Sequence, residues 1–477
     1  MIHKEQTKKL AVFYFAIALF LGLGFYVMLK KESYWFFALP LVLLIAYYYL
    51  ISLDKIVLLI TFLTPLAVTL SNSALGAALS VPSEPLMFGV LIIFLGNMIL
   101  AGHYNKKASN HVISYLIYFS LLWMFITSFS SAMPLVSFKH LLSRIWFVVP
   151  FYFVTIPMFR IRRNIHRFIW LYILGLSIVV VYTLIRHAGY GFNEDSAHWV
   201  MTPFYNDHTA YGAALSMFLP VLAGYTFFPA ISMRKRIIAL SFFVLFSVAL
   251  TLSYSRAAWL SVAVASFVFL LVFFHIRFRW VATGTAFLLI MLFSFQQQIF
   301  DKLEKNKQNS STSFVDHVES MSNISSDASN MERLNRWASA IRMFGQRPWL
   351  GWGPGTYQFE YAPFQLASER TQISTNLGDR GNAHSEYLGP LSEEGFLGLI
   401  SVLLLFGFAI KTGLKIHRNG SREMKFISLM ITLGLITYFF HGFMNDFLDS
   451  DKLSVPVWGF MAILVSLDIY QLKEDTQ

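Results

Sequence analysis

The sequence predicts an all-α fold that crosses a membrane many times. Of the 477 residues, 56% are hydrophobic and only 13% are charged, a composition too apolar for the surface of an ordinary soluble protein. Apolar runs of roughly twenty residues recur along the chain, and a helix of that length spans the ~30 Å hydrocarbon core of a bilayer. The expected fold class is an all-α, polytopic integral membrane protein with about 12–14 transmembrane helices and one long outer segment.

Fourteen apolar runs can be placed, and each is expected to form one span. Twelve spans are the alternative, because only Asp54 and Lys55 separate the second and third runs and the sixth run, residues 145–159, is short. The first run, residues 10–29, follows three lysines and no cleavage site closes it, so it is expected to be a retained helix. The runs are centred near residues 20, 43, 63, 93, 120, 151, 176, 218, 246, 266, 289, 403, 433 and 460.

The formal charge of +11 is interpreted as a topology signal. Lys and Arg lie singly or in short clusters between apolar runs, which argues against a nucleic-acid-binding surface. With the N-terminus in the cytoplasm, 21 of them fall in inner segments, seven in short outer loops and nine in one long outer segment. This asymmetry predicts an even number of spans with both termini inside. The seven are Lys30, Lys31, Lys139, Arg144, Arg186, Arg256 and Lys452.

In this topology every candidate site residue faces outward. The outer polar regions are the loop 186–208, the tight connection at Ser255 and Arg256, and the long segment 301–394. The chain is expected to divide into N-terminal spans (1–190), central spans with the arginine hairpin (191–300), the long outer segment (301–390) and C-terminal spans (391–477).

An amphipathic helix is expected within the long outer segment. Leu334, Trp337, Ile341 and Phe344 recur at helical spacing, with arginines around them. The Pro- and Gly-rich stretch 348–355 follows and cannot continue a helix. The helix is predicted to lie on the outer membrane surface.

Ionisable residues where this segment meets the run centred near 403 form the main candidate site. Hydrocarbon excludes groups such as His384, Glu386 and Glu394 unless they line a watery or protein-filled cavity. An ordinary imidazole has a pKa of ~6.5, so His384 can accept a proton near neutral pH. The alternatives are a histidine at the membrane interface and carboxylates that cap a helix.

Arg256 is the second candidate. It is the only charge in residues 237–274, and almost no loop carries it away from the bilayer. A guanidinium is always charged and its donors match phosphate oxygens, so Arg256 can bind a phosphate group without a metal. The alternative is an arginine that only reaches toward the membrane surface.

Neither a cofactor nor a metal is expected. The chain has no cysteine, which excludes thiolate ligands and cysteine nucleophiles, and its inner loops contain no Gly-rich phosphate loop. A rival metal site is the D-x-D pattern formed by Asp449 and Asp451, with Asp446 nearby, because carboxylates of this kind hold divalent cations. We interpret these three acids as a solvated turn.

Four short motifs occur in order between roughly residues 200 and 410. They are residues 204–206; residues 255–260; Arg336 and Trp337 running into 348–355; and residues 382–388 followed by 394–398. On one membrane face and in this order, they resemble the O-antigen ligase and O-antigen polymerase superfamily of bacterial membrane glycosyltransferases.

The resemblance implies a metal-independent, inverting enzyme. It would move a glycan from undecaprenyl diphosphate to a hydroxyl acceptor at the periplasmic face of the bacterial inner membrane. An O-antigen ligase with the lipid A core as acceptor is the first expectation. An O-antigen or capsule polymerase, with a second lipid-linked glycan as acceptor, is the alternative. His384 is expected to take the acceptor's proton and Arg256 to hold the diphosphate. The expected substrate-binding residues are Arg336, Arg333, Asn206, Glu386 and Glu394.

A hypothesis from another class is a transporter or flippase for the same lipid-linked sugars. Such proteins often contain internal repeats and charged or broken helices near the membrane midplane. No repeat is evident here and the ionisable residues gather at the outer boundary of the spans, which favours an enzyme. The expected partners are the glycan donor, its acceptor and membrane lipids, and no nucleic acid.

Overall fold

The computed structural model describes most of the chain. The described residues are 19–26, 28–30, 35–72, 77–102, 105–228, 231–276, 279, 283, 328–370, 374 and 381–471. They fall into two units, residues 1–56 and 57–477. The first unit contains a 3-10 helix, Trp35–Ala38, and the apolar helix α2, Leu39–Ile51.

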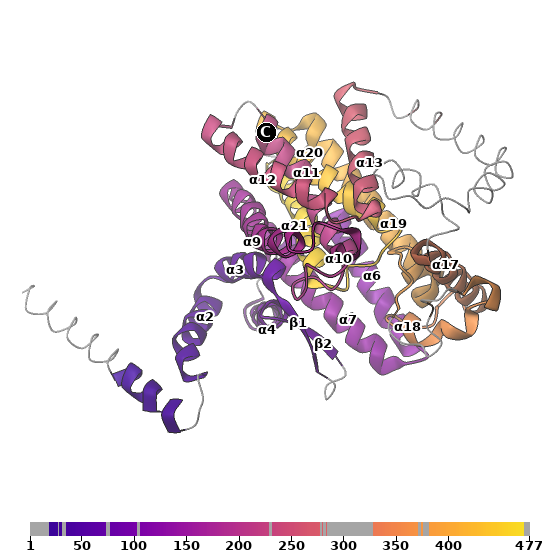
Figure 1. The fold of residues 1–477 in the computed structure, drawn as a ribbon, viewed down its shortest axis with the longest axis horizontal. Helices are drawn as coiled ribbons and strands as arrows, with labels where there is room; N and C mark the ends of the chain where they lie inside the picture. Colours follow the sequence, from indigo (N-terminus) through magenta and orange to yellow (C-terminus); the bar gives the residue numbers. More distant parts are fainter. Residues whose placement is uncertain are drawn as a thin grey trace, which may run out of the picture. The chain divides into compact units, whose positions relative to one another are not determined.

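The second unit is built almost entirely of helices (Figure 1). Its first half contains α3 (Leu53–Leu63, which begins in the first unit), α4 (Ser83–Ala101), α5 (Lys106–Ser109), α6 (Val112–Phe129), α7 (Pro134–Val148), α8 (Thr155–Met158), α9 (Arg162–Ala188) and α10 (Glu194–Ala197). The helices that follow are α11 (His208–Phe227), α12 (Met233–Thr251), α13 (Arg256–Phe273), α17 (Ala328–Gln346), α18 (Tyr357–Glu360), α19 (Leu388–Asn419), α20 (Arg422–His441) and α21 (Asp451–Ser466).

The predicted all-α, polytopic fold class is confirmed. Within the described residues, nine helical segments are long and apolar enough to cross a membrane. Besides the run near residue 63, four other predicted spans are not among these nine. The helices near residues 20 and 43 are apolar but shorter, and α12, near residue 246, has three basic residues in its first turn. The run near residue 289 lies outside the described residues. The nine segments are Ser83–Leu100, Val112–Phe129, Pro134–Met158, Arg162–Ala188, His208–Phe227, Arg256–Phe273, Leu388–Asn419, Arg422–His441 and Asp451–Tyr470.

The span predicted near residue 63 is wrong. There α3 ends after eleven residues, a 3-10 turn (Thr64–Leu66) follows, and β1 (Val68–Asn72) pairs antiparallel with β2 (Ala77–Val81). Pro65 cannot continue the helical hydrogen bonding, and the carbonyls freed at the turn need donors. Lys452 supplies them, because its Nζ donates to the carbonyl oxygens of Thr64 at 2.6 Å and Ala67 at 2.7 Å. Lys452, expected in an outer loop, is therefore buried.

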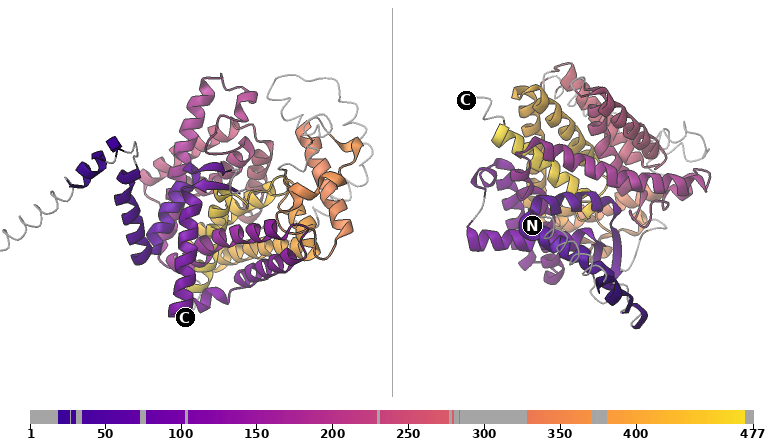
Figure 2. Two further views of the ribbon diagram at one scale, coloured as in Figure 1. Left: turned by 90° about the horizontal axis from the view of Figure 1, so that it is seen from below. Right: turned by 90° about the vertical axis from the view of Figure 1, so that its left-hand side faces the viewer.

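The core of the second unit is the C-terminal helix. The segment Asp451–Tyr470, formed by α21 and a π-helical extension, is buried along its whole length. Figures 1 and 2 show its yellow ribbon among the other helices of the bundle, and α20, α8, α7 and α19 all contact it. A helix that is apolar on all sides and enclosed by other helices is typical of the centre of a membrane bundle.

The helix α19 contains a break that shapes the outer end of the bundle. Gly395 has φ 73° and ψ −163°, so the first two turns of α19 are set off from the rest. The loop after α17 packs into this break: Gly353 N donates to Glu393 O at 2.7 Å and Phe396 N donates to Pro348 O at 2.9 Å. Trp123 of α6 donates to Glu394 O at 2.9 Å. The backbone groups that the break releases are thus satisfied by other segments.

Gly395→Ala is expected to destabilise the protein. A Cβ at this position would lie 2.4 Å from Trp349 O, and the positive φ alone costs a non-glycine residue about 1–2 kcal/mol. Gly407→Ala in the same helix is the matched control, since nothing lies within 4 Å of its added Cβ and alanine favours helix by up to ~1 kcal/mol. Thermal unfolding of the purified proteins in detergent should give a lower Tm for Gly395→Ala only. Equal Tm values would contradict the tight packing at the break.

Candidate functional site

The described segments predicted to be outer place the predicted site residues at one end of the bundle. Arg256 is the first residue of α13, and His208 is the first residue of α11. Arg333 and Arg336 lie on α17, and His384 precedes α19. In Figure 1 the orange-brown ribbon of α17 and α18 lies beside the start of α19, and α17 contacts α19 directly.

His384 is held by its backbone in an unusual conformation. Its φ is 47°, in the left-handed region, which histidine adopts more readily than most residues. Asn382 Oδ1 accepts from His384 N at 3.1 Å, and Trp337 Nε1 donates to His384 O at 3.3 Å. Both contacts involve the backbone of His384 and not its imidazole.

The electrostatic environment of His384 keeps its ring neutral. Burial lowers its pKa to about 3, and the positive charges of Arg336 and Arg333 contribute to the decrease, while Asp207 and Glu332 oppose it. The side chain is half-buried. Near neutral pH the imidazole therefore carries a free lone pair and can accept a hydrogen bond.

Arg333 interacts electrostatically with both predicted catalytic residues. Burial lowers the pKa of Arg333, and the nearby charge of Arg256 lowers it further, while Asp207 raises it. Because Arg333 also acts on His384, the two sites predicted from distant parts of the sequence share one electrostatic environment. Two guanidinium groups that repel each other in this way form a place where an anion would be stabilised.

Arg336, which was predicted to bind substrate, is buried and contacts several other residues of the protein. Its Nε donates to Glu332 Oε1 at 2.9 Å, its Nη1 donates to Asn382 O at 3.0 Å, and its guanidinium lies 5.4 Å from the ring centre of Tyr361. Arg336 thus ties α17 to the loop that carries His384, and its predicted contact with substrate stays a prediction.

Asn206 is exposed and lies just before the first residue of α11. Its neighbour Asp207 caps this helix, since Asp207 Oδ1 accepts from the backbone N–H groups of Thr209 and Ala210 at 2.8 Å. Two histidines lie beside this cap, with His198 Nδ1 and His208 Nδ1 3.0 Å apart. Sequence spacing alone did not indicate the histidine pair, because His198 comes from the preceding loop.

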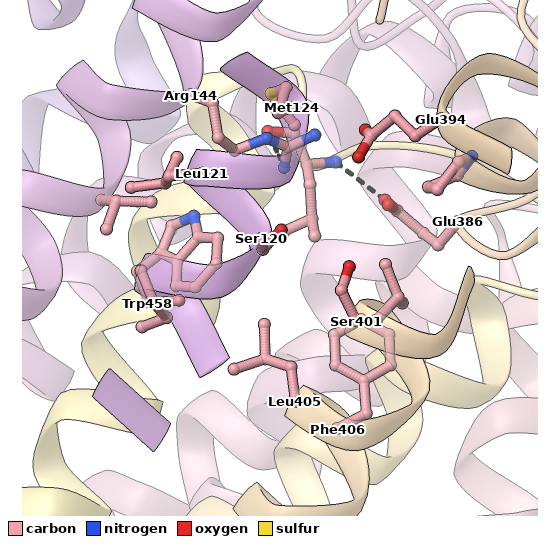
Figure 3. A pocket seen from close by; sticks show the side chains of 15 residues that line it. Ser120, Leu121, Met124, Arg144, Glu386, Glu394, Ser401, Leu405, Phe406 and Trp458 are labelled. Atoms are coloured by element: carbon pink, nitrogen blue, oxygen red, sulfur yellow. Dashed lines mark hydrogen bonds between the residues drawn. The ribbon is translucent and has the colours of Figure 1, made fainter. Parts of the chain in front are cut away.

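Glu386 and Glu394, which were predicted to bind substrate, are both buried. Glu386 Oε1 accepts from the hydroxyl of Tyr438 and from the backbone N–H groups of Phe447 at 2.8 Å and Leu448 at 2.9 Å. Burial raises the pKa of Glu386, and Arg144 opposes the increase. Figure 3 shows Glu386, Glu394 and Arg144 around a cavity of about 50 Å³. Their predicted role in binding substrate stays a prediction.

Arg144 is a residue that the sequence prediction misplaced. It was assigned to an outer loop, but it lies in α7 and its side chain is largely buried. Its Nη2 donates to Asp449 Oδ1 at 2.8 Å and its Nη1 donates to Leu448 O at 3.3 Å. The only sequence signal was a lone arginine at the edge of a short apolar run.

Glu393 is a second residue whose function the sequence did not indicate. Its Oε2 accepts from Gly355 N at 2.9 Å and its Oε1 accepts from Tyr357 N at 2.8 Å. One carboxylate therefore fixes the end of the Pro- and Gly-rich loop against α19. These two hydrogen bonds join the loop after α17 to α19 and so help to position α17 relative to His384.

The acids of the rival metal site have protein partners. Asp449 pairs with Arg144, and Asp451 Oδ2 accepts from Ser83 Oγ at 2.5 Å. Among the described residues, no group of three His, Asp or Glu side chains is arranged to hold a metal ion.

The apolar residues predicted to define the outer helix are confirmed to be helical, but they do not form its buried side. Leu334 and Ile341 are 40% and 54% exposed, whereas the buried side of α17 carries polar residues such as Glu332 and Arg336 together with the apolar Ala340 and Met343. The exposed apolar residues remain consistent with the predicted position at the membrane surface.

The apolar helices define a multi-pass membrane protein, and a polar, cationic cluster lies at one end of its helical bundle. Residues 241–403, about a third of the chain, match a protein-family model described as O-antigen ligase. The predicted resemblance to the O-antigen ligase and polymerase superfamily is thereby confirmed over this region, which includes Arg256, Arg333, Arg336 and His384. The search of curated proteins finds no match.

Proposed function

We propose that this protein transfers a glycan from undecaprenyl diphosphate to a hydroxyl group of a lipid acceptor at the periplasmic face of the bacterial inner membrane. The first assignment is an O-antigen ligase whose acceptor is the lipid A core. The proposal is supported by the O-antigen ligase match over residues 241–403. The main supporting observation is that Arg333 links the two predicted catalytic residues electrostatically. Its charge lowers the pKa of His384, and the charge of Arg256 lowers the pKa of Arg333.

The chemistry is a single displacement at the anomeric carbon. The acceptor oxygen forms a bond to that carbon from the face opposite the diphosphate, and the bond to the diphosphate oxygen breaks. The electron pair leaves with undecaprenyl diphosphate, and the acceptor's proton passes to the free nitrogen of His384. Arg256 and Arg333 stabilise the negative charge that develops on the leaving diphosphate.

The arginines also link donor binding to the basicity of His384. In the free protein, burial and the charges of Arg336 and Arg333 hold the pKa of His384 near 3, which makes it a weak base. A diphosphate beside Arg333 offsets that positive charge, so the pKa of His384 rises when the donor is bound. His384 therefore becomes an effective base only when the diphosphate-linked glycan is bound.

A polymerase reaction uses the same donor side and differs in its acceptor. The purified full-length protein would be reconstituted in vesicles and given labelled undecaprenyl-diphosphate glycan, with or without lipid A core, in the presence and absence of a chelator. We expect label on lipid A core and no effect of the chelator. Longer lipid-linked chains would identify a polymerase, loss of activity in chelator would restore the metal hypothesis, and movement of glycan without any new glycosidic bond would overturn the proposal.

A further inference from the structure

A second polar region lies at the opposite end of α19 from His384. There, the last turns of α19, the start of α6 and the end of α21 enclose a groove of about 870 Å³. The positive-inside prediction assigns residues 411–425 to the cytoplasmic side. This groove and the candidate active site are therefore expected on opposite faces of the membrane.

The groove combines basic side chains with an apolar wall. Lys411, Lys415 and Arg418 line it, and among the described residues Asp468 is the only carboxylate on its lining. The apolar part of the lining includes Val112, Phe408 and Ile410. Such a combination matches a ligand with an anionic head and a hydrocarbon chain.

The charges in the groove are only partly compensated. Lys415 Nζ contacts Asp468 Oδ1 at 2.6 Å, and His111 Nε2 lies 3.4 Å from the other carboxylate oxygen. Lys411 and Arg418 have no acidic partner within the part of the chain that the structure describes, and both are exposed. Lys411 Nζ instead lies 5.0 Å from the ring centre of Phe408, at the junction of the polar and apolar parts.

The length of α19 places this junction near the membrane surface. At 1.5 Å per residue, the 24 residues 396–419 beyond its break extend about 36 Å, which exceeds the ~30 Å hydrocarbon core. The break at Gly395 marks the outer end, so roughly twenty residues beyond it reach the headgroup region near Lys415. Lys411 and Arg418 lie on either side of that level.

We propose that this groove binds an anionic phospholipid of the cytoplasmic leaflet. The lipid phosphate would lie between Lys411 and Arg418, and an acyl chain would lie against Phe408 and Ile410. The proposal does not depend on the transferase function, because the groove contains none of the residues assigned to it. A bound lipid would fix α19 against α6 and the end of α21.

The test measures lipid binding by the delipidated, full-length protein in detergent. Phosphatidylglycerol should bind and raise the Tm, whereas phosphatidylcholine should not. Two cations near a phosphate contribute about 1 kcal/mol each, so Lys411→Gln with Arg418→Gln should weaken phosphatidylglycerol binding about 30-fold. The exchange Lys411→Arg with Arg418→Lys should retain it, as should Arg163→Gln, which removes an exposed charge outside the groove.

Three outcomes would overturn the proposal. The double glutamine variant could bind phosphatidylglycerol as the unchanged protein does. Phosphatidylcholine could bind equally well, which would show that the charges play no part. Inorganic phosphate at equal concentration could displace the lipid completely, which would assign the site to a free anion. If the double glutamine variant does not fold, the comparison of phosphatidylglycerol with phosphatidylcholine on the unchanged protein still tests the proposal.

Discussion

His384→Ala is expected to reduce glycan transfer by about 10²–10⁴-fold, the usual contribution of a positioned general base. The charges of Arg336 and Arg333 act on this imidazole, and alanine leaves the acceptor hydroxyl without it as a proton acceptor. His417→Ala is the matched control, because it removes a histidine from the far end of α19, the helix that His384 precedes. Transfer would be measured as turnover of lipid-linked glycan per molecule of folded protein. Near-normal turnover in His384→Ala would remove this residue from the proposed role.

The pH dependence of the reaction should follow the protonation of His384. Transfer requires the neutral ring, so the rate is lost as the pH falls through the pKa. Because burial and the arginine charges lower that pKa to about 3, kcat/KM should stay level from neutral pH down to about pH 4. Arg333→Gln removes one of these charges and should move the acid limb to higher pH. An acid limb near 6.5 in the unchanged protein, or no movement in the variant, would contradict the electrostatic link.

Arg256→Gln is expected to lower kcat/KM by about 10²–10³-fold, the range found when one charge-stabilising donor is removed from an active site. The loss arises because the departing diphosphate would retain only Arg333. Arg256→Lys keeps the charge but not the fork of donors, so it should recover part of the activity.

The control for Arg256 is Arg163→Gln, which removes an exposed charge from the start of α9. Both variants should insert and purify alike. Full activity in Arg256→Gln would show that the arginine only anchors α13 at the membrane surface. Equal losses in Arg256→Gln and Arg256→Lys would show that charge alone is insufficient and that the donor geometry is required.

Much of the fold follows from the length and polarity of the apolar runs. Helices such as α6, α9 and α20 are each predicted by one uninterrupted run of sufficient length. The run near residue 63 misleads because its ending depends on Pro65 and on Lys452, almost four hundred residues away. Run length does not show which lysine will satisfy a distant carbonyl.

The candidate site was predictable where its chemistry is local. His384 and Arg256 stand out because each is an ionisable residue at the mouth of an apolar span. The roles of Glu393 and Arg144 were not predictable, because each depends on partners brought close by folding. For Glu386, the sequence indicated an important carboxylate but not that its partners lie in the connection between α20 and α21.

The exposed apolar residues of α17 limit how the segment that contains this helix can be produced for experiments. An excised piece beginning at residue 328 and ending before α19 would lose Glu393, which fixes its Pro- and Gly-rich loop. It would still present Leu334, Ile341 and Trp349 to water. Such a fragment is expected to aggregate when secreted alone, so antibodies and ligands against this region are best raised with the intact protein in a bilayer.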